Sequence, residues 1–212
     1  MPPADRSLEE VVASLSRLKP EEFTHDRLNE VLGGRPIREG AWRPRARFRD
    51  DKYARHLIHR SDLFSLILLC WKPGQGSPVH NHQGNLGWMR VLRGRIEETH
   101  YQPPGWVVAG VPMPGDDFDI DDEGVGHGIA LQRGAHLVHP AGPAVASVDR
   151  ERPIHQIANP LRHADDEAAV TLHVYSRPHD ACLAFDVETN TCRRIELVFD
   201  SVSGGGESFA AS

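Results

Sequence analysis

The amino-acid sequence predicts a mainly β protein, an antiparallel sandwich or barrel with two or three short helices at its N-terminus. From residue 64 onward, short runs of strand-forming residues alternate with glycine and proline. No long helical segment lies between these runs, which is typical of an antiparallel sandwich or barrel. The chain has 212 residues, of which 39% are hydrophobic, so it is large enough to form one packed domain.

Residues 7–33 are expected to form two short helices ahead of the β structure. Ser7 precedes a leucine and two glutamates, a sequence suited to cap the first helix. Apolar residues recur behind it at helical spacing. Pro20 fits the first position of the second helix, which is expected to end at Gly33 and Gly34.

The β structure is expected to occupy about residues 50–200, followed by a flexible glycine- and serine-rich tail over residues 203–212. The acidic stretch 114–126 is expected to be a solvated loop. A calcium loop is the alternative, but the ligand spacing and central glycine of an EF-hand are absent. The predicted strands are residues 64–71, 86–92, 95–101, 128–131, 136–139, 145–148, 155–158, 170–176, 183–187 and 194–199.

Composition argues against several classes of function. The chain has 24 basic and 30 acidic residues, and its net charge of −6 argues against a general affinity for nucleic acid or an anionic membrane. The longest apolar run, residues 63–71, is too short to cross a bilayer, and the polar N-terminus does not resemble a signal peptide. Three cysteines without CxxC spacing disfavour a disulfide framework. We therefore expect a cytoplasmic protein; the oligomeric state is left open.

The chain contains 13 histidines, and three of them have a spacing that suits a metal. His80 and His82 are two residues apart on an expected strand, so both project to one face. His155 lies on a separate expected strand. Three imidazoles on one side of a metal leave coordination positions open. A His-x-His pair alone also occurs on ordinary surfaces, but the glycines around this one favour a metal site.

The segment around the histidine pair resembles the first motif of the cupin superfamily. A glycine precedes His80 by six positions, and Gly94 follows His82 by twelve. A later segment, residues 155–159, resembles the end of the second motif. The glutamate usual in the first motif is missing, because Gly87 stands in its place. The resemblance implies a jelly-roll-like cupin barrel with a three-histidine site.

The wider pattern is similar to the cysteine dioxygenases, which are cupin-fold thiol dioxygenases with non-haem iron. The similarity covers nearly the whole chain, and the order and spacing of the pieces are more specific than any one piece. It implies an Fe(2+) enzyme that adds both atoms of O2 to the sulfur of L-cysteine and forms cysteine sulfinic acid. The matching segments are residues 53–55, 69–71, 80–82, 92–94, 97–99, 155, 171–176 and 180–186.

The resemblance implies roles for three candidate metal ligands and two residues of the substrate pocket. His80, His82 and His155 match the iron ligands of the family. Arg55 matches the arginine that holds the substrate carboxylate, which a planar guanidinium can bind with two parallel hydrogen bonds. Tyr53, two residues earlier on an extended segment, is expected to face the same side and to assist.

Three further residues match a serine–histidine–tyrosine row of the family. Thr171, His173 and Tyr175 alternate on one expected strand and therefore share a face. Thr171 replaces the family serine and keeps a hydroxyl. Tyr175 is expected to place its hydroxyl beside the substrate, with His173 bonded to it. Cys182 matches a cysteine near the family pocket and is expected to line the substrate entrance.

The other cysteines and histidines are expected to be ancillary. Cys70 is expected in the core, and Cys192 in an exposed turn. His179 is expected near the pocket, because it follows the tyrosine loop. The remaining unmatched histidines are expected to be structural or surface residues: His100, His127, His136, His139 and His163.

The sequence departs from the vertebrate members of the family at two places. Gly87 stands where they have a cysteine that is crosslinked to the tyrosine, so Tyr175 is expected to be a free phenol, as in bacterial members. Where the vertebrate members have a serine–proline pair joined by a cis peptide bond, this chain has Ser176 and Arg177. A trans bond is therefore expected here. Arg177 is also expected to bring a second cation near the pocket.

Three alternatives stay open. The related 3-mercaptopropionate dioxygenases carry glutamine where Arg55 stands, so Arg55 favours cysteine, while the loss of the serine–proline element weakens that preference. A non-catalytic cupin that binds a metal or small ligand would explain the barrel but not the order of the other matching residues. A zinc or manganese cupin isomerase would use the same histidines. In the leading hypothesis the partners are a small thiol and O2, with no nucleic acid or membrane.

Overall fold

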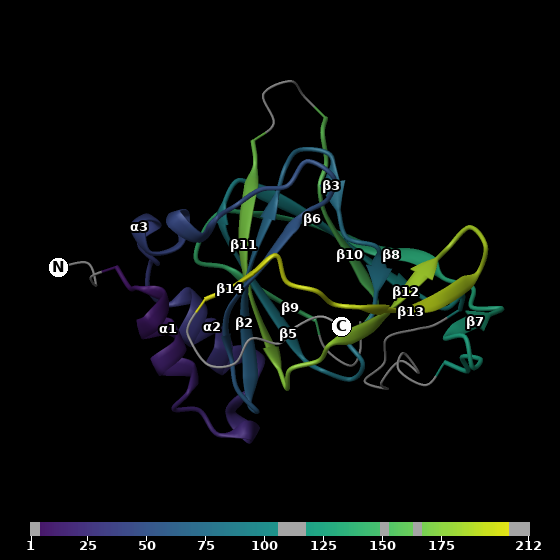
Figure 1. The fold of residues 1–212 in the computed structure, drawn as a ribbon, viewed down its shortest axis with the longest axis horizontal. Coiled ribbons are helices and arrows are strands. Elements are labelled where there is room, and N and C mark those ends of the chain that lie inside the picture. Colours follow the sequence, from purple (N-terminus) through teal and green to yellow (C-terminus); the bar gives the residue numbers. More distant parts are fainter. Residues whose placement is uncertain (1–4, 106–117, 149–152, 163–166, 204–212) are drawn as a thin grey trace.

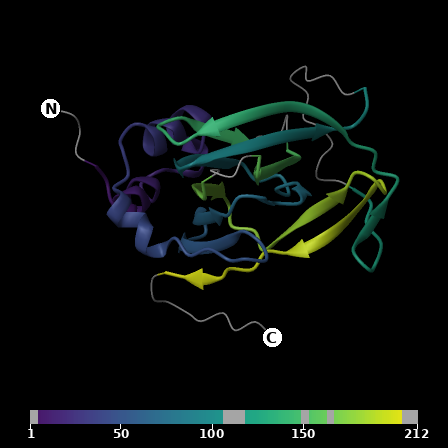
Figure 2. The same cartoon turned by 90° about the horizontal axis from the view of Figure 1, so that it is seen from above.

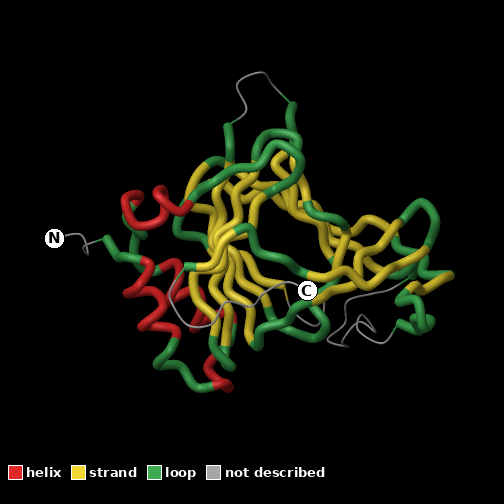
Figure 3. The backbone as a smooth tube through the Cα atoms, viewed as in Figure 1, coloured by secondary structure: helices red, strands yellow, loops and turns green. Residues whose placement is uncertain are grey.

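The computed structural model describes residues 5–105, 118–148, 153–162 and 167–203. Within these ranges the chain is mainly β, and its short helices gather on one side of the strands (Figure 1, Figure 3). The predicted fold class is confirmed as a jelly-roll-like arrangement. The strands form two sheets packed on each other (Figure 2), and these sheets do not close into one continuous barrel.

The α-helices and two 3₁₀ turns precede the sheets. Ser7 caps the first helix: its hydroxyl accepts a hydrogen bond from the Glu10 amide, and the Glu10 carboxylate accepts one from the Ser7 amide. The expectation that Pro20 opens the second helix is wrong. Pro20 begins a separate turn, and the helix begins after Thr24, whose hydroxyl accepts a hydrogen bond from the Arg27 amide. The elements are α1 (Leu8–Leu15), the turn Pro20–Glu22, α2 (His25–Gly33), α3 (Glu39–Trp42) and the turn Arg43–Arg45.

The first sheet has six strands and packs against the helices. Its neighbouring strands are antiparallel, except for the parallel pair at one edge, β1 and β14. In spatial order the strands are β14 (Ser201–Val202), β1 (Ala54–Arg60), β2 (Phe64–Trp71), β11 (Ala169–Ser176), β5 (Gly87–Arg93) and β9 (Val145–Val148).

The second sheet has eight strands, and β10 lies at its centre. β10 pairs with β4 and β3 along one edge and with β6 along the other. In spatial order the main path is β7 (Val125–His127), β13 (Thr191–Glu196), β12 (Ala181–Asp186), β4 (Val79–His80), β10 (His155–Asn159), β6 (Arg95–Gln102) and β8 (Gln132–Pro140), with β3 (Gln75–Gly76) beside β10.

Several strands differ from those predicted. β1 was not predicted, because four of its seven residues are polar and they come in adjacent pairs rather than alternating with apolar residues. Residues 128–131 are not a strand, since Gly128 has a φ of +74° that interrupts extended backbone, and β7 ends just before it. β8 is longer than the predicted strand 136–139. β4 ends at His80, so His82 lies beyond the strand rather than on it.

β2 shows that the first sheet packs on both of its faces. It is buried along its whole length, so it reads as a continuous apolar run rather than an alternating one. Leu66 and Leu68 pack in the cluster formed with the helices, while Ile67 and Leu69 pack in the cluster between the sheets. Burying each such side chain contributes about 1.5–3 kcal/mol. The site described below lies on the face of β11 that is in register with Ile67 and Leu69.

The three cysteines are free thiols and all are buried. Cys70 lies in the core as expected. The expectation for Cys192 is wrong: it lies on β13 with 2% of its surface exposed, packed in a cluster with Val79 and Phe185. The sequence suggested a turn because the true turn, which holds Asn190 at a φ of +54°, immediately precedes this strand.

Two further expectations concern the surface of the protein. Part of the acidic stretch lies outside the described residues; in the part that is described, Asp121 accepts hydrogen bonds from the amides of Glu123 and Val125 and so forms a turn. Among the described residues, no helix is both long enough and apolar enough to cross a membrane.

Candidate metal centre and adjoining pocket

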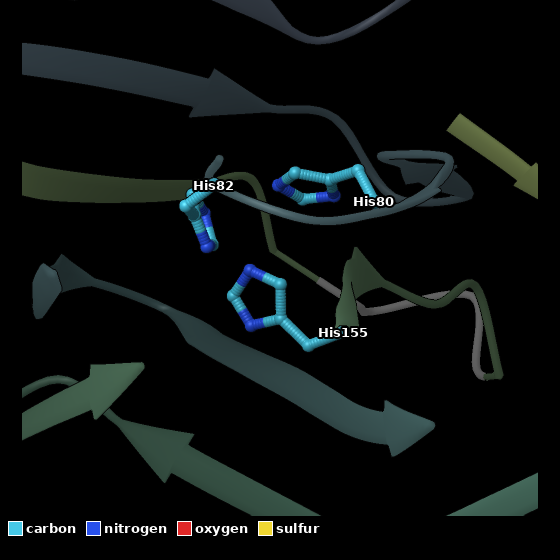
Figure 4. Close-up of side chains that lie close together, drawn as sticks. All are labelled: His80, His82 and His155. Carbon is cyan, nitrogen blue, oxygen red and sulfur yellow. The ribbon is translucent and has the colours of Figure 1, made fainter. Parts of the chain in front are cut away.

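Three histidines converge between the two sheets (Figure 4). His80 on β4 lies directly opposite His155 on β10, and His82 follows the end of β4. The ring centroids are 4.8 to 5.0 Å apart, which makes a nearly equilateral triangle. Their candidate ligand atoms all lie within 4.8 Å of one another, and no other such group of three occurs among the described residues. The structure therefore brings the three predicted ligands together.

The hydrogen bonds of these rings suit a metal. Nδ1 of His80 lies 3.0 Å from the Pro78 carbonyl oxygen, and Nδ1 of His155 lies 2.6 Å from a carboxylate oxygen of Glu98. Each contact leaves Nε2 of the ring available as a ligand. His82 is 2% exposed, and neither of its ring nitrogens has a hydrogen-bond partner among the described residues. Such unpaired buried nitrogens are costly unless something binds them, and a metal ion would do so.

The electrostatics keep His80 and His82 in the form that binds metal. Removal from water lowers the pKa of His80 to about 3, and the neighbouring His155 adds to this effect. The same causes lower the pKa of His82 well below its usual value. Both rings are therefore neutral near pH 7, and neutral imidazole is the form that coordinates a metal.

Glu98 is a buried carboxylate that the sequence analysis did not single out. It lies on β6 with 1% of its surface exposed and contacts three histidines: His155, His139 at 2.8 Å and His100 at 3.5 Å. Burial opposes the ionisation of Glu98, but the hydrogen bonds from His139 and His155 outweigh it and hold its pKa below the usual range. A signal was present, because a glutamate and His100 share one face of a strand next to the buried Ile96.

His100 and His139 were expected to be structural or surface residues. Both instead contact Glu98, the partner of the candidate ligand His155. His136 instead lies on the surface beside Thr99, and His127 is exposed on β7. His163 lies outside the described residues.

A chain of hydrogen bonds follows β11 toward the metal centre. The indole of Trp71 donates to the hydroxyl of Thr171 at 2.9 Å. That hydroxyl lies 2.8 Å from Nε2 of His173, and Nδ1 of His173 lies 3.2 Å from the hydroxyl of Tyr175. The Tyr175 ring lies beside His82, with centroids 5.3 Å apart. The structure therefore aligns the row predicted from the sequence and adds Trp71 at its far end.

The Tyr175 phenol and the His173 imidazole are both buried and both neutral. Burial raises the pKa of Tyr175 to about 12 and lowers the pKa of His173 to about 3. Gly87 lies directly opposite Tyr175 on β5, and a Cβ atom built there would be 3.1 Å from Cε1 of the tyrosine ring. The side chain at that position is a hydrogen, so Gly87 places no thiol beside the phenol.

A small pocket is lined by two of the three histidines, His80 and His82. Its lining also includes Arg55, Tyr53, Cys182 and Tyr175. Nε of Arg55 is buried without a hydrogen-bond partner among the described residues, and its guanidinium lies 5.6 Å above the ring of Phe199. The Tyr53 ring stacks on Trp71 at 4.4 Å. The pocket thus offers an unsatisfied cation next to the metal centre.

The loop after Tyr175 brings His179 but not Arg177 into this pocket. The His179 ring lies 5.2 Å from that of Tyr175 and 6.2 Å from that of His82. Arg177 is exposed at a φ of +60° and is not among the lining residues, so the expected second cation is absent from the described pocket. No cis peptide occurs among the described residues, and the bond between Ser176 and Arg177 is trans as expected.

Comparisons with known proteins find several relatives with one name. The sequence model of the family described as Cysteine dioxygenase type I matches residues 11–115. Cysteine dioxygenase type 1 of Rattus norvegicus is 27% identical over 207 residues, which cover 95% of this chain and 92% of the relative. The Bos taurus protein of the same name is 25% identical over 209 residues, covering 98% and 92%. The Homo sapiens protein is 27% identical over 199 residues, covering 91% and 88%.

Solved structures that are similar to this chain include cupin proteins. TT1209 from Thermus thermophilus matches with a TM-score of 0.40 and 19% identity, over 64% of this chain and 92% of that chain. An RmlC-like cupin protein from Desulfovibrio desulfuricans matches with a TM-score of 0.37 and 22% identity, over 63% and 91%.

The two packed sheets and the convergent histidines define a cupin with a three-histidine metal site. The three relatives match over nearly their whole length, and each is named cysteine dioxygenase type 1. The chain is thus similar to the cysteine dioxygenases over nearly its whole length.

Proposed function

We propose that this protein is an iron(II)-dependent dioxygenase of L-cysteine. The reaction joins one thiol and one O2 to give cysteine sulfinic acid: the sulfur gains two oxygen atoms and is oxidised by four electrons, which reduce the O2, so no further reductant is needed. The observation that carries the proposal is that Arg55 lies in the same small pocket as His80 and His82, with a buried Nε that has no hydrogen-bond partner among the described residues.

The three histidines would hold the iron. Bound there, iron(II) supplies the activation of dioxygen and a site for the substrate sulfur. The ligand set fits this use, because three neutral nitrogens occupy one side and leave the remaining positions for substrate and O2. No carboxylate of the described residues competes for those positions.

Arg55 would bind the substrate carboxylate. Its backbone is held in place, because its amide donates to a carboxylate oxygen of Asp200 at 2.8 Å and Asp200 also pairs with Arg49 at 2.7 Å. The guanidinium itself is left to the pocket, where its fork matches the two oxygens of a carboxylate. Tyr53 stacks on Trp71 and lines the pocket, as Cys182 does, so both would confine the substrate.

Tyr175 would donate a hydrogen bond to the substrate. The raised pKa keeps its proton at neutral pH. His173 orients the phenol through Nδ1, and Thr171 fixes the other ring nitrogen of His173. Since both ring nitrogens are engaged, the imidazole cannot turn without losing a buried hydrogen bond.

The proposal is tested by oxygen uptake with iron-loaded protein of measured iron content, comparing cysteine with 3-mercaptopropionate. We expect higher kcat/KM for cysteine and about one iron per chain. A clear preference for the thiol without an amine would overturn the cysteine assignment in favour of the related dioxygenases. Well-folded protein that takes up no iron would instead favour a non-catalytic cupin.

A further inference from the structure

We propose that Glu98 is a positioning residue of the metal centre and supplies, through His155, the carboxylate that the ligand set lacks. The inference rests on the metal centre but not on which thiol the protein oxidises. The first cupin motif of this chain has Gly87 in place of its usual glutamate, so the ligands are three neutral rings. Glu98 brings a negative charge within one hydrogen bond of that set.

The contact between Glu98 and His155 fixes the chemistry of the ring. Nδ1 of His155 donates to Oε1 of Glu98 at 2.6 Å, so the proton is on Nδ1 and the lone pair of Nε2 is directed away from the carboxylate. A carboxylate in this position also makes the imidazole a stronger ligand. Both side chains are buried, so water does not weaken the contact.

The strand register explains why Glu98 reaches this place. On β6, Glu98 lies opposite Ile157 of β10, which makes it the diagonal neighbour of His155 on the same face. On its other side it lies opposite Leu137 of β8, which makes it the diagonal neighbour of His139. Glu98 therefore bridges three strands of the sheet.

The second carboxylate oxygen is held as firmly as the first. Nε2 of His139 lies 2.8 Å from Oε2 of Glu98, and Nε2 of His100 lies 3.5 Å from Oε1. With a partner on each oxygen, the carboxylate cannot rotate toward the centre and become a ligand itself. The arrangement offsets part of the charge of a bound divalent cation while leaving its open positions to substrate and O2.

The test replaces Glu98 by glutamine and measures metal binding directly. In Glu98→Gln, the full chain should bind Co²⁺ about 10 to 100 times more weakly than the wild type, measured anaerobically by competition with a chelator. The absorption bands of the bound Co²⁺ should also shift, because the His155 ligand changes. In the iron-loaded variant, the Fe³⁺/Fe²⁺ midpoint potential should rise, since a nearby negative charge favours the higher oxidation state.

Glu97→Gln is the matched control. Glu97 is the adjacent residue on β6, but its carboxylate faces away from Glu98 and pairs with Arg162 at 2.5 Å and His136 at 3.4 Å. This variant should retain the wild-type Co²⁺ affinity within about twofold. Equal affinities for Glu98→Gln, Glu97→Gln and the wild type would overturn the proposal.

A second variant covers the case in which Glu98→Gln does not fold. His139→Gln leaves Glu98 and His155 in place and removes the imidazole that holds Oε2. We expect a weakening of Co²⁺ binding that is smaller than that of Glu98→Gln, with an unfolding midpoint close to the wild type. Unchanged affinity and unchanged Co²⁺ spectra in this variant would contradict the role of Glu98. Protein that shows these effects but oxidises no thiol would leave the inference standing and remove the proposed activity.

Discussion

In the proposed function, Arg55 is the residue on which the choice of substrate would depend. In Arg55→Gln, we expect KM for cysteine to rise at least tenfold, because a charge-assisted pair of hydrogen bonds contributes about 1.5–3 kcal/mol for each bond. Iron content should not change, since Arg55 is not one of the three candidate ligands. The measurement is oxygen uptake against cysteine concentration, with iron determined on the same sample. Arg55→Lys, which keeps the charge and loses the fork, should show an intermediate KM. Parallel loss of iron and of cysteine binding would contradict this role.

In the proposed function, Tyr175 would act through its hydroxyl. Tyr175→Phe should lower kcat for cysteine about 100-fold, because a donor placed beside the reacting substrate is lost. The ring still packs against His82, so iron loading should be retained. Rapid measurement of oxygen uptake at saturating cysteine, together with iron analysis, separates the two effects. A variant with the wild-type kcat would show that the phenol is only a packing group.

At the scale of single residues, spacing along the sequence was sufficient to predict site residues whose partners lie nearby in the chain. His80 and His82 are two positions apart, and the row on β11 follows the alternation of a strand. Glu98 was missed because its partners, His139 and His155, are 41 and 57 residues away. They meet only through the register of three strands, which spacing along one strand does not reveal.

At the scale of single elements, β11 carries a row of buried hydrogen bonds in which the Thr171 hydroxyl links Trp71 to His173. Thr171→Val removes the acceptor of the Trp71 indole and the partner of His173 Nε2. We expect a loss of about 1–3 kcal/mol in the free energy of unfolding for each buried group left unpaired. Urea denaturation of metal-free protein measures this loss.

Thr171→Ser is the matched control for the threonine hydroxyl. Serine keeps the oxygen and loses only a methyl group, so most of the stability and of kcat should be retained. If the Thr171→Val and Thr171→Ser variants were equally stable and equally active, the hydrogen-bonded row would have no structural role.

The elements also show which local signals are reliable. The unbroken apolar run of β2 predicted a buried strand, and the Ser7 cap predicted the start of α1. The start of α2 was misplaced because both Pro20 and Thr24 are acceptable helix starts, and only the packing of the intervening Phe23 in the core favours the later one. β1 was missed because half of its residues are polar, and its burial depends on β2 and the pocket.

At the scale of the whole molecule, the site is divided between the two sheets. His80 and His155 belong to the second sheet, whereas Arg55 and Tyr175 belong to the first. The sequence predicted both groups but not their sheet partners, because pairing between distant strands follows from tertiary packing rather than from local pattern. The candidate metal ligands lie on or just beyond strands of the second sheet, and the pocket beside them is completed only where the first sheet packs against it.

Packing the sheets around these residues buries neutral imidazoles, and this makes the stability of the metal-free protein depend on pH. The folded-state pKa of His173 is about 3, because burial disfavours the charged ring, whereas an unfolded histidine titrates near 6.5. Above pH 6.5 the ring is neutral in both states and adds no pH dependence. Below pH 6.5 the unfolded chain binds a proton that the folded protein does not, so the free energy of unfolding falls as pH falls.

For His173 alone, the loss at pH 5 should be about 2 kcal/mol relative to pH 7. His80, also near pKa 3, and His179, near pKa 4, contribute in the same direction. The window from pH 6.5 to 5 is chosen because the lowered pKa of Glu98 affects stability only below about pH 4.5.

Urea unfolding of metal-free wild type and His173→Asn at several pH values in this window measures the difference. The asparagine variant should lose less stability than the wild type between pH 7 and pH 5, by about 2 kcal/mol, whatever its stability at pH 7. Parallel pH profiles would mean that His173 is protonated in the folded protein, and then Tyr175 would face an imidazolium rather than a neutral ring.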